Sequence, residues 1–341
     1  MSTFIDLLRI HHDEFEQQFG NQLSHESRRA IYAMLSCKTS NQGCSQWFCG
    51  HCQHDDRCHQ RTTSDWLERQ QSKLLPVHYF MVTFTLPYEL RALARSQPKP
   101  LYQSMFSVAA SVLKDFSRRK NGGEIGFTTV LHTHSRKRNL HPHLHIIVAN
   151  GSYNKTRNQW HKSKSNYLFN AFALAKVWRA RMIDAINQHA DLSLANADTL
   201  PTKWVVDCRK VGYGLPALQY LSRYLYRGVL PDKDIIDTSN NTVTFNYKDG
   251  QTQAIKTRTL PTLQFLWLIL QHVLPKGLQR VRDYGFLHGN AKRLRVRIQA
   301  ILLYLFNWKI PKLVATFTAK VIRICPCCQH EMKCVGITRT T

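Results

Sequence analysis

The fold is decided by the stretch His141-Pro142-His143-Leu144-His145-Ile146-Ile147-Val148. Its composition predicts an extended strand, and the side chains of a strand alternate between its two faces. His143 and His145 therefore point to one side, while Leu144 points into the layer behind. Two imidazoles side by side on a rigid strand supply half of a divalent-metal site. The pattern predicts a metal centre on one face of a β-sheet.

A third metal ligand is expected from the strand that precedes this one. Residues Phe127–His132 have strand composition, and the basic segment Ser135–Asn139 separates the two strands, which predicts a β-hairpin. His132 and His134 have the same parity, so spacing alone does not choose between them. We favour His132 because it lies deeper in the apolar strand. Imidazole ligands suit Mn²⁺ or Zn²⁺ better than Mg²⁺, and such a metal would polarise a phosphate oxygen.

Two tyrosines lie four residues apart in a helix predicted downstream. At about 100° per residue, Leu218 and Leu221 fall on an apolar stripe, and Tyr220 and Tyr224 lie together on its flank. An amphipathic helix with aromatic residues at its rim would show the same pattern. A phenol has an ordinary pKa of about 10, so a nucleophilic tyrosine needs a nearby cation, which the metal, Arg223 or Arg227 could supply. With the histidines, these tyrosines suggest cleavage of a nucleic-acid strand through a tyrosine–phosphate link.

Charge and composition agree with a nucleic-acid partner. The 341 residues carry a formal net charge of +25 and are 43% hydrophobic, which is typical of a packed protein that binds a polyanion. The longest apolar run, Phe265–Leu270, is too short to cross a membrane, and the N-terminus lacks the core of a signal peptide. We therefore expect a cytosolic protein without a membrane partner, whose 10 cysteines bind metal rather than form disulfides.

Composition divides the chain into three predicted domains. These are a helical, Cys/His-rich, zinc- and DNA-binding domain over 1–76, a catalytic domain over 77–231, and a basic region with a hairpin, helices and a Cys-rich tail over 232–341. Within the second domain the order β-α-β-β-α-β-α predicts helices packed on an antiparallel sheet. The expected strands cover 78–86, 127–132, 144–148 and 204–207, and the expected helices cover 101–119, 167–186 and 216–227.

Cysteines gather near both ends of the chain. A structural zinc site is predicted in the first domain, although the irregular spacings do not say which residues ligate; the candidates are Cys37, Cys44, Cys49, Cys52 and Cys58. The tail offers a second, weaker candidate site in Cys325 and Cys328, with Cys334 and His330 as further ligands.

The basic loop Arg136-Lys137-Arg138 lies between the two histidine strands, where a DNA backbone would have to pass. A charge run is usually a solvated face of a protein. In this position, however, it predicts backbone contacts, which give affinity and salt dependence without reading the sequence.

Jointly, these motifs resemble the rolling-circle insertion-sequence transposases of the two-tyrosine HUH class, known as the IS91 family. The resemblance covers nearly the whole chain. Besides the Cys-rich N-terminal region it rests on Tyr79–Pro87, His141–His145, Lys203–Asp207, Tyr220–Tyr224 and His272–Gly277. The chain departs from the family between Cys44 and Cys58, where the paired Cys-x-x-Cys motifs are less regular.

The resemblance implies an α+β fold: an HUH-endonuclease palm with a central antiparallel sheet flanked by helices, an N-terminal zinc-binding domain and a basic C-terminal helical or zinc-ribbon region. His143 and His145 would hold Mg²⁺ or Mn²⁺ together with a ligand from the neighbouring strand. The family's tyrosine motif falls on Tyr220 and Tyr224. One tyrosine would attack single-stranded DNA, leaving a 5′-phosphotyrosine and a free 3′-hydroxyl, and the other would allow a second strand to be held during exchange.

The same resemblance implies the partners, which are single-stranded DNA and the ends of the mobile element in the nucleoid of a bacterial cell. No nucleotide cofactor is expected, because the phosphotyrosine conserves the bond energy and the chain has no Gly-x-x-x-x-Gly-Lys phosphate loop. Other HUH nickases, either plasmid replication initiators or conjugative relaxases, are the nearest alternative. A non-catalytic zinc-dependent DNA-binding protein is another. A two-histidine phosphoesterase would need two His-x-Thr/Ser motifs, which the histidine cluster lacks.

Overall fold

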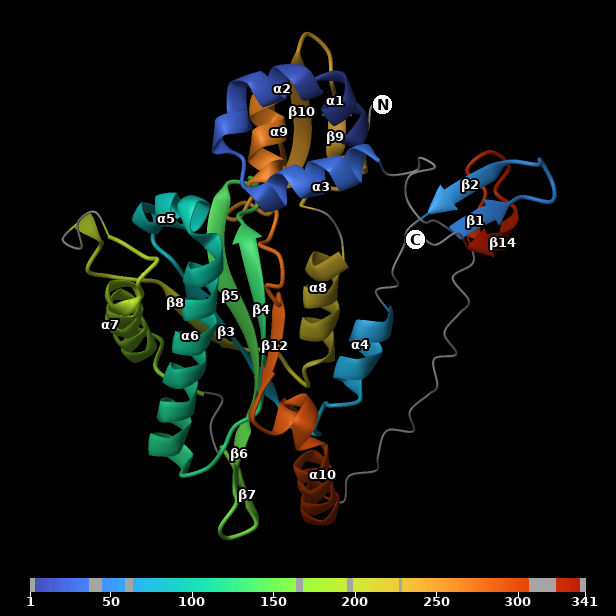
Figure 1. Cartoon of the computed structure of the whole chain (residues 1–341). Helices are drawn as coiled ribbons and strands as arrows, with labels where there is room; N and C mark the ends of the chain where they lie inside the picture. The colour runs from blue at the N-terminus through green and yellow to red at the C-terminus, as the bar shows by residue number, and fades with distance from the viewer. Residues whose placement is uncertain are drawn as a thin grey trace.

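The computed structural model shows an α+β protein in which helices cover both faces of a central antiparallel sheet (Figure 1). It describes residues 4–36, 45–58, 64–163, 168–194, 199–226, 229–306 and 323–337. Smaller sheets lie above, below and beside the central one in the view of Figure 1. The predicted fold class, with its antiparallel sheet between helices, is confirmed.

The central sheet has five strands in the order β12-β4-β5-β3-β8, and each neighbouring pair is antiparallel. The expected hairpin and the buried strand before it are therefore present, and both hairpin strands are longer than expected. The strands are β3 (Tyr79–Thr85), β4 (Phe127–His134), β5 (Leu140–Ala149), β8 (Val206–Lys210) and β12 (Val281–Tyr284).

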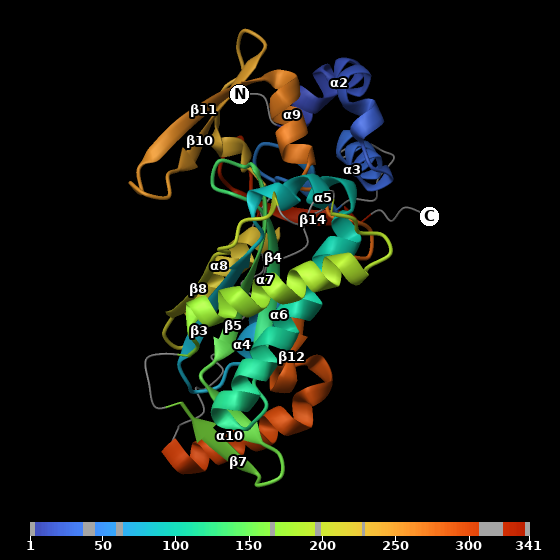
Figure 2. The ribbon, with the colours of Figure 1, turned by 90° about the vertical axis from the view of Figure 1, so that its left-hand side faces the viewer.

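Strand alternation gives the sheet two faces with separate cores. Val82, Leu131 and Leu144 are fully buried on one face, against helices α6 (Pro98–Asn121) and α7 (Ala171–Gln188). Figure 2 shows both helices lying across this face. Burial of these apolar side chains fixes which residues of each strand point to the opposite face.

The opposite face packs against α4 (Ser64–Gln71), α8 (Leu215–Tyr226) and α10 (Lys292–Phe306), which lie on the other side of the sheet from α6 in Figure 1. Val130 and Ile147 are buried here. Three further elements complete this part of the chain: the short helix α5 (Arg91–Ser96) before α6, and the strands β6 (Gly151–Asn154) and β7 (Gln159–Lys162), which pair with each other.

Two predicted elements begin two or more residues later in the structure than expected. Helix α7 begins at Ala171 rather than at 167, because the side chain of Asn170 caps it by accepting a hydrogen bond from the Ala173 amide at 3.0 Å. The strand expected at 204–207 begins only at Val206. Trp204 instead packs edge-on against the core residue Trp178, so that packing overrides its strand propensity.

Strand β12 comes from the region after residue 231, yet it belongs to the central sheet. It pairs with β4 at the edge of the sheet, from Val281 opposite Val130 to Tyr284 opposite Phe127. Composition did not predict this contact, because the composition of a segment does not indicate which distant strand it pairs with. The sheet that carries the histidines therefore includes a strand from the last part of the chain.

A polar cluster ties β12 to the sheet and to α4. The Asp283 carboxylate accepts hydrogen bonds from Lys73 at 2.6 Å, from Thr128 at 2.6 Å and from Gln70 at 3.1 Å. The Lys73 and Asp283 side chains are only 17% and 14% exposed, so the two charges neutralise each other largely out of water. Removing one partner of such a pair strongly destabilises the folded protein, because the remaining charge stays buried without a counterion.

The first and last regions also share a core. Helices α1 (Phe4–Ile10), α2 (His12–Phe19) and α3 (His25–Leu35) pack against helix α9 (Thr262–Leu270) and a three-stranded sheet. In this core the Phe19 and Trp267 rings stack with centroids 4.9 Å apart. We call this unit the upper lobe; its strands are β9 (Ile235–Asp237), β10 (Thr242–Lys248) and β11 (Ile255–Pro261).

A four-stranded sheet joins segments near both ends of the chain. Its order is β13-β14-β1-β2, so its two middle strands come from opposite ends and pair antiparallel. The strands are β1 (Ser45–Phe48), β2 (Asp55–Cys58), β13 (Arg323–Ile324) and β14 (Glu331–Ile337). Among the residues that the structure describes, no helix combines the length and the apolar character needed to span a bilayer.

The Lys73–Asp283 pair should stabilise the central sheet. Truncation in Asp283→Ala would leave a largely buried ammonium without its partner, so we expect a loss of about 3 kcal/mol in the free energy of unfolding. In the double variant Lys73→Met/Asp283→Asn both charges are gone, while the amide still offers an oxygen to Thr128. Urea unfolding should show that this variant recovers more than half of the loss.

The pair Lys155–Glu124 supplies a control, because the Lys155 side chain is 65% exposed. Lys155→Ala should change the free energy of unfolding by less than about 0.5 kcal/mol. An equal loss in Asp283→Ala and in the double variant would show that the buried charge is not what destabilises the truncated protein.

Candidate metal and tyrosine site

Three histidines from the central hairpin meet on the face that carries α8. His132 on β4 lies directly opposite His143 on β5, and His145 follows two residues along β5 on the same face. The ring centroid of His132 is 5.3 Å from that of His143 and 4.6 Å from that of His145. One nitrogen of each ring lies within 4.8 Å of the others. The structure thus brings together the three residues selected from the sequence.

The register of the hairpin separates His132 from His134. The ladder is irregular between these residues, and His134 pairs with Leu140 near the turn. The ring of His134 lies 5.3 Å from that of His272, in the segment after α9. Parity did not distinguish the two histidines, but the irregular register places His132, and not His134, in the cluster.

In both β5 histidines the Nδ1 atom has a polar partner, which makes the Nε2 atom the one available to a metal. His143 Nδ1 donates to the carbonyl oxygen of His141 at 2.7 Å. His145 Nδ1 lies 3.0 Å from the Thr83 hydroxyl on the neighbouring strand β3. Partners of this kind orient an imidazole and fix which nitrogen can bind a metal. The donor set therefore fits a divalent ion with three nitrogen ligands and open positions.

The three rings are neutral at neutral pH. Burial lowers the pKa of His132 well below its usual range, and the neighbouring His145 and His143 lower it further. Burial lowers the pKa of His143 to about 4, although its bond to His141 opposes the shift. Burial, followed by the charges of His143 and Arg209, lowers the pKa of His145 to about 3. Because a metal binds the deprotonated ring, no proton has to be displaced near pH 7.

Tyr220 extends from α8 toward this cluster. Its ring lies edge-on to that of His145, with centroids 6.3 Å apart, and the residue is 40% exposed. Leu218 and Leu221 on the same helix are buried against the sheet, as expected of the apolar stripe. The side chains of residues 223–226, which include Arg223 and Tyr224, lie outside the described set, so their roles stay predictions.

The turn between β8 and α8 sets where this helix starts. Gly214 has φ +87°, and a Cβ atom there would come within 2.9 Å of the Tyr79 ring and 3.0 Å of Leu74. Only glycine combines this backbone conformation with so close an approach. The turn therefore brings α8, and Tyr220 with it, onto the face of the sheet that carries the histidines.

Three polar residues near the site were not predicted from the sequence. Thr83 contacts His145 directly, and the positive charges of Arg280 and Arg209 act on the histidine rings. Arg280 also donates from Nε to the Leu131 carbonyl at 3.1 Å, next to the cluster. The alternation of side chains along β3 indicates which face of the sheet Thr83 lies on. The position of Arg280, in contrast, depends on the pairing of β12 with β4.

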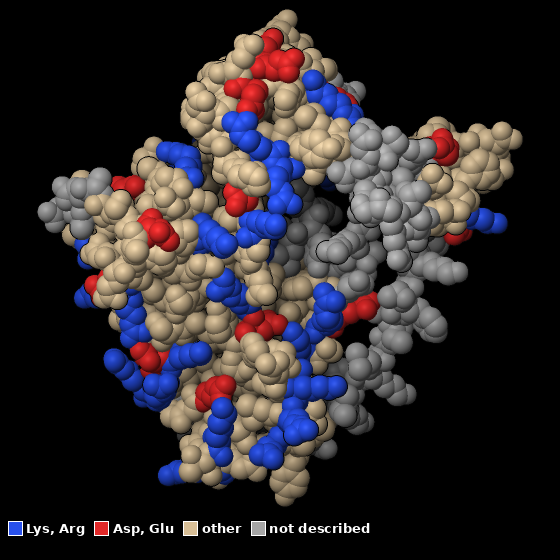
Figure 3. All heavy atoms as spheres, viewed as in Figure 1, with Lys and Arg blue, Asp and Glu red and all other residues tan. Residues whose placement is uncertain are grey.

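The basic loop between the histidine strands divides into two parts. Arg136 and Lys137 are exposed, although Arg136 also donates to the Asp249 carbonyl at 2.9 Å. Arg138 turns inward: its side chain is 15% exposed, and its guanidinium lies 3.9 Å from Asp234, the residue before strand β9 of the upper lobe. Arg138 therefore helps to attach the upper lobe to the hairpin, and its two neighbours present their charge to solvent. Figure 3 shows more Lys and Arg than Asp and Glu on this view of the molecule.

The cysteines of the two ends come together. Cys49 and Cys52 form one group with Cys325 and Cys328, so the two sites considered separately in the sequence meet at one place. The sulfur of Cys334 instead approaches the Gly336 carbonyl, at 3.6 Å. Two further candidates, Cys37 and Cys44, lie outside the described residues, as does the side chain of Cys58.

Two protein families match the chain. The family described as "Putative transposase" matches residues 126–295, a range that contains the histidine hairpin, α8 and β12. The family described as "Transposase zinc-binding domain" matches residues 7–86, which contain the first cysteine pair of the four-cysteine group.

Individual relatives agree with these families. The "Putative transposase y4qJ" of Sinorhizobium fredii is 29% identical, over 97% of this chain and 94% of its own length. The "Transposase for insertion sequence element IS801" of Pseudomonas savastanoi pv. phaseolicola is 26% identical, over 75% of this chain and 69% of its own. Among solved structures, the conjugative relaxase TrwC in complex with mutant oriT DNA is similar at a TM-score of 0.28, with 15% identity over 66% of this chain and 72% of its own.

The hydroxyl of Thr83 should matter for metal binding. In Thr83→Val the ring of His145 loses its hydrogen-bond partner, so we expect Mn²⁺ affinity to fall roughly ten- to hundredfold. Isothermal titration of the zinc-loaded protein with Mn²⁺ measures this. Thr129→Val makes the same change at a buried position of β4 whose parity is opposite to that of His132, and it should leave the affinity unchanged. An unaltered affinity in Thr83→Val would mean that the hydroxyl does not orient the ring.

Proposed function

We propose, given that the chain belongs to the IS91 family of insertion-sequence transposases, that it cleaves and rejoins single-stranded DNA through a 5′-phosphotyrosine. The observation that carries the proposal is the position of Tyr220, which faces His145 from α8 while His132 and His143 complete the cluster. A nucleophile beside three neutral imidazoles is an arrangement suited to metal-assisted phosphoryl transfer.

In the proposed reaction the Tyr220 oxygen attacks the phosphorus of the scissile phosphodiester. A bond forms between the phenolic oxygen and phosphorus, and the bond from phosphorus to the 3′-oxygen breaks. The proton lost by the phenol is balanced by the proton that the leaving 3′-oxygen gains, so the products are a phosphotyrosine and a 3′-hydroxyl. Attack by a different 3′-hydroxyl on the phosphotyrosine rejoins the strands and releases the tyrosine.

His132, His143 and His145 would hold the ion, Mn²⁺ or Mg²⁺. When bound, such an ion supplies positive charge next to a phosphate oxygen and favours the phenolate. Thr83 holds His145 in the orientation that leaves Nε2 available. Arg280 adds a fixed positive charge near His132, where negative charge on the phosphate would be stabilised.

Tyr224, one helical turn after Tyr220, is proposed as the second nucleophile. Two tyrosines on one helix flank would let one enzyme hold a donor strand and a target strand at once, as strand exchange needs. Arg136 and Lys137, exposed in the loop of the histidine hairpin, would contact the backbone of the incoming strand, as would Arg223. We place this activity on the ends of the mobile element, in the bacterial cytoplasm at the nucleoid.

The covalent step gives the first test. A labelled single-stranded oligonucleotide that carries the element's end should give a metal-dependent protein–DNA adduct on a denaturing gel. The double variant Tyr220→Phe/Tyr224→Phe lacks both attacking oxygens, so its adduct should fall by at least about a hundredfold. The two single variants then show which tyrosine attacks first.

Tyr213→Phe is the matched control, since Tyr213 is exposed just before α8 and packs on His78 rather than on the cluster. It should form the adduct at the wild-type rate, whereas His143→Ala should not form it. An adduct of unchanged yield in the double tyrosine variant would disprove the proposed nucleophiles.

The basic loop gives a second test. Removing two backbone contacts in Arg136→Ala/Lys137→Ala should reduce the slope of log K against log salt for single-stranded DNA by about 1.4. Fluorescence anisotropy across a salt series measures this slope. Lys99→Ala/Lys176→Ala removes the same charge from exposed positions on α6 and α7 and should leave the slope nearly unchanged. Equal slopes in the two double variants would exclude a specific contact at the loop.

A further inference from the structure

Two short segments near opposite ends of the chain have the same sequence pattern. Cys49-Gly50-His51-Cys52-Gln53-His54 and Cys325-Pro326-Cys327-Cys328-Gln329-His330 both follow Cys-x-x-Cys-Gln-His. Each connects two strands of the four-stranded sheet, the first from β1 to β2 and the second from β13 to β14. We call them the N-terminal and the C-terminal knuckle.

The two knuckles also have the same backbone structure. In the N-terminal knuckle, Cys49 N donates to His54 O at 2.9 Å and Gln53 N donates to Cys49 O at 2.9 Å. The corresponding bonds in the C-terminal knuckle measure 2.8 Å and 3.0 Å. The glutamine has φ +58° in the first and +60° in the second. Because a non-glycine residue rarely adopts this conformation, its repetition shows two copies of one specific turn.

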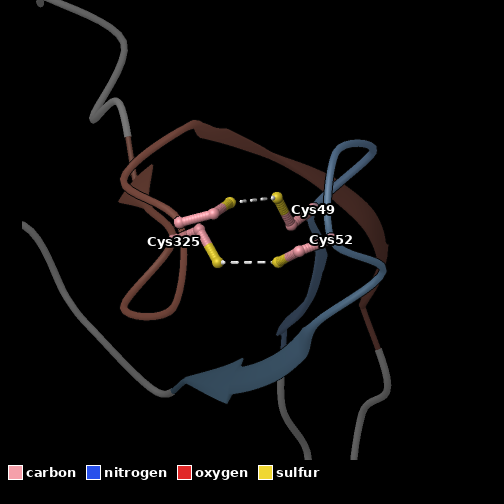
Figure 4. A group of neighbouring side chains, drawn as sticks. Cys49, Cys52 and Cys325 are labelled. Atoms are coloured by element: carbon pink, nitrogen blue, oxygen red, sulfur yellow. Dashed lines mark hydrogen bonds between the residues drawn. The ribbon is translucent and has the colours of Figure 1, made fainter.

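The four cysteine sulfurs share one small space. Cys49 Sγ lies 3.4 Å from Cys328 Sγ, and Cys52 Sγ lies 3.5 Å from Cys325 Sγ. All four lie within 4.8 Å of one another. Figure 4 shows Cys49 and Cys52 facing Cys325 from the opposite segment. A zinc ion with Zn–S bonds of about 2.3 Å would separate its sulfurs by about 3.8 Å, whereas a disulfide would need about 2.05 Å.

Among the described residues, the core around the sulfurs is too small to hold the segments together by itself. The buried apolar side chains there are those of Cys49, Cys325 and Met332, with Trp47 and Cys328 partly buried against them. Pairing of β1 with β14 adds only a short ladder. Units of this size depend on a metal or on disulfides for their stability.

We propose that Cys49, Cys52, Cys325 and Cys328 bind one Zn²⁺ ion, so that the two knuckles form a single zinc ribbon that neither end of the chain builds alone. Four thiolates around one ion make a closed, tetrahedral site with a structural role. The ion would join residues 279 positions apart in the chain, as Cys49 and Cys328 are. The zinc-binding family matches only residues 7–86, so half of this ligand set lies outside it.

Zinc content of the full-length protein tests the proposal without any need for DNA cleavage. Cys49→Ser/Cys52→Ser should lose one zinc per chain, and Cys325→Ser/Cys328→Ser should also lose one. If the same ion is bound by both pairs, the quadruple variant also loses one and not two. Cys327→Ser/Cys334→Ser is the matched control, since both thiols are exposed in the same segment, and it should keep the wild-type content.

Three results would overturn the shared zinc site. A loss of two ions in the quadruple variant would mean two separate sites, and an unchanged zinc content in Cys325→Ser/Cys328→Ser would mean that the tail does not ligate. One iron per chain in place of zinc would overturn the choice of metal, because four thiolates also suit iron. Thermal unfolding of each variant, monitored by circular dichroism of its β-sheet, distinguishes loss of the ion from general misfolding.

A cut chain gives a second readout. A protease site inserted between Phe306 and Arg323 allows the tail to be released from the purified, zinc-loaded protein. The tail should stay with the body in gel filtration and leave it when zinc is removed with a chelator and a thiol reagent. A tail that separates while zinc stays on the body would disprove the proposal, as would a tail that stays after all zinc is gone.

Discussion

The geometry of the histidine cluster depends on the register between β4 and β5. Side chains of paired strands share a face only in alternate positions, so a slip of one residue would move a whole set of side chains to the opposite face. The observed register puts His132 directly opposite His143, with His145 beside them. This register is fixed by the apolar residues next to the histidines, because the paired Leu131 and Leu144 are fully buried in the core with α6 and α7. Packing on one face of the sheet therefore determines the geometry of the histidine cluster on the other.

The last third of the chain completes structures that the first part begins. Strand β12 adds to the edge of the histidine sheet, α9 with its three strands covers α1–α3, and β14 pairs with β1. The first of these contacts brings Arg280 near His132, and Arg138 in the histidine hairpin contacts Asp234 of the upper lobe. The surroundings of the site are therefore assembled from segments far apart in the chain.

Whether a feature could be predicted from the sequence depends on how far apart in the chain its contacting residues are. The His143/His145 pair and the leucine stripe beside Tyr220 arise from local periodicity, and the structure contains both. The choice of His132 needed one strand pairing, which the short basic loop indicated. Arg280 and the shared cysteine group depend on contacts between segments far apart in the chain, which periodicity does not report. The repeat of Cys-x-x-Cys-Gln-His at the two ends was nevertheless a visible signal, because Cys-x-x-Cys turns commonly pair around one zinc ion.

The two candidate metal sites differ in the number and kind of their donors, and this difference distinguishes their roles. The histidine cluster offers three neutral nitrogen donors on a sheet face with Tyr220 beside them, so an ion bound there would keep open coordination positions. The knuckles offer four sulfur donors, which fill a tetrahedron and leave no position for a substrate. Soft thiolates retain zinc, whereas imidazoles also accept Mn²⁺, so one protein can keep a structural ion while it exchanges the other. An open site is therefore expected on the sheet and a closed one at the joined ends.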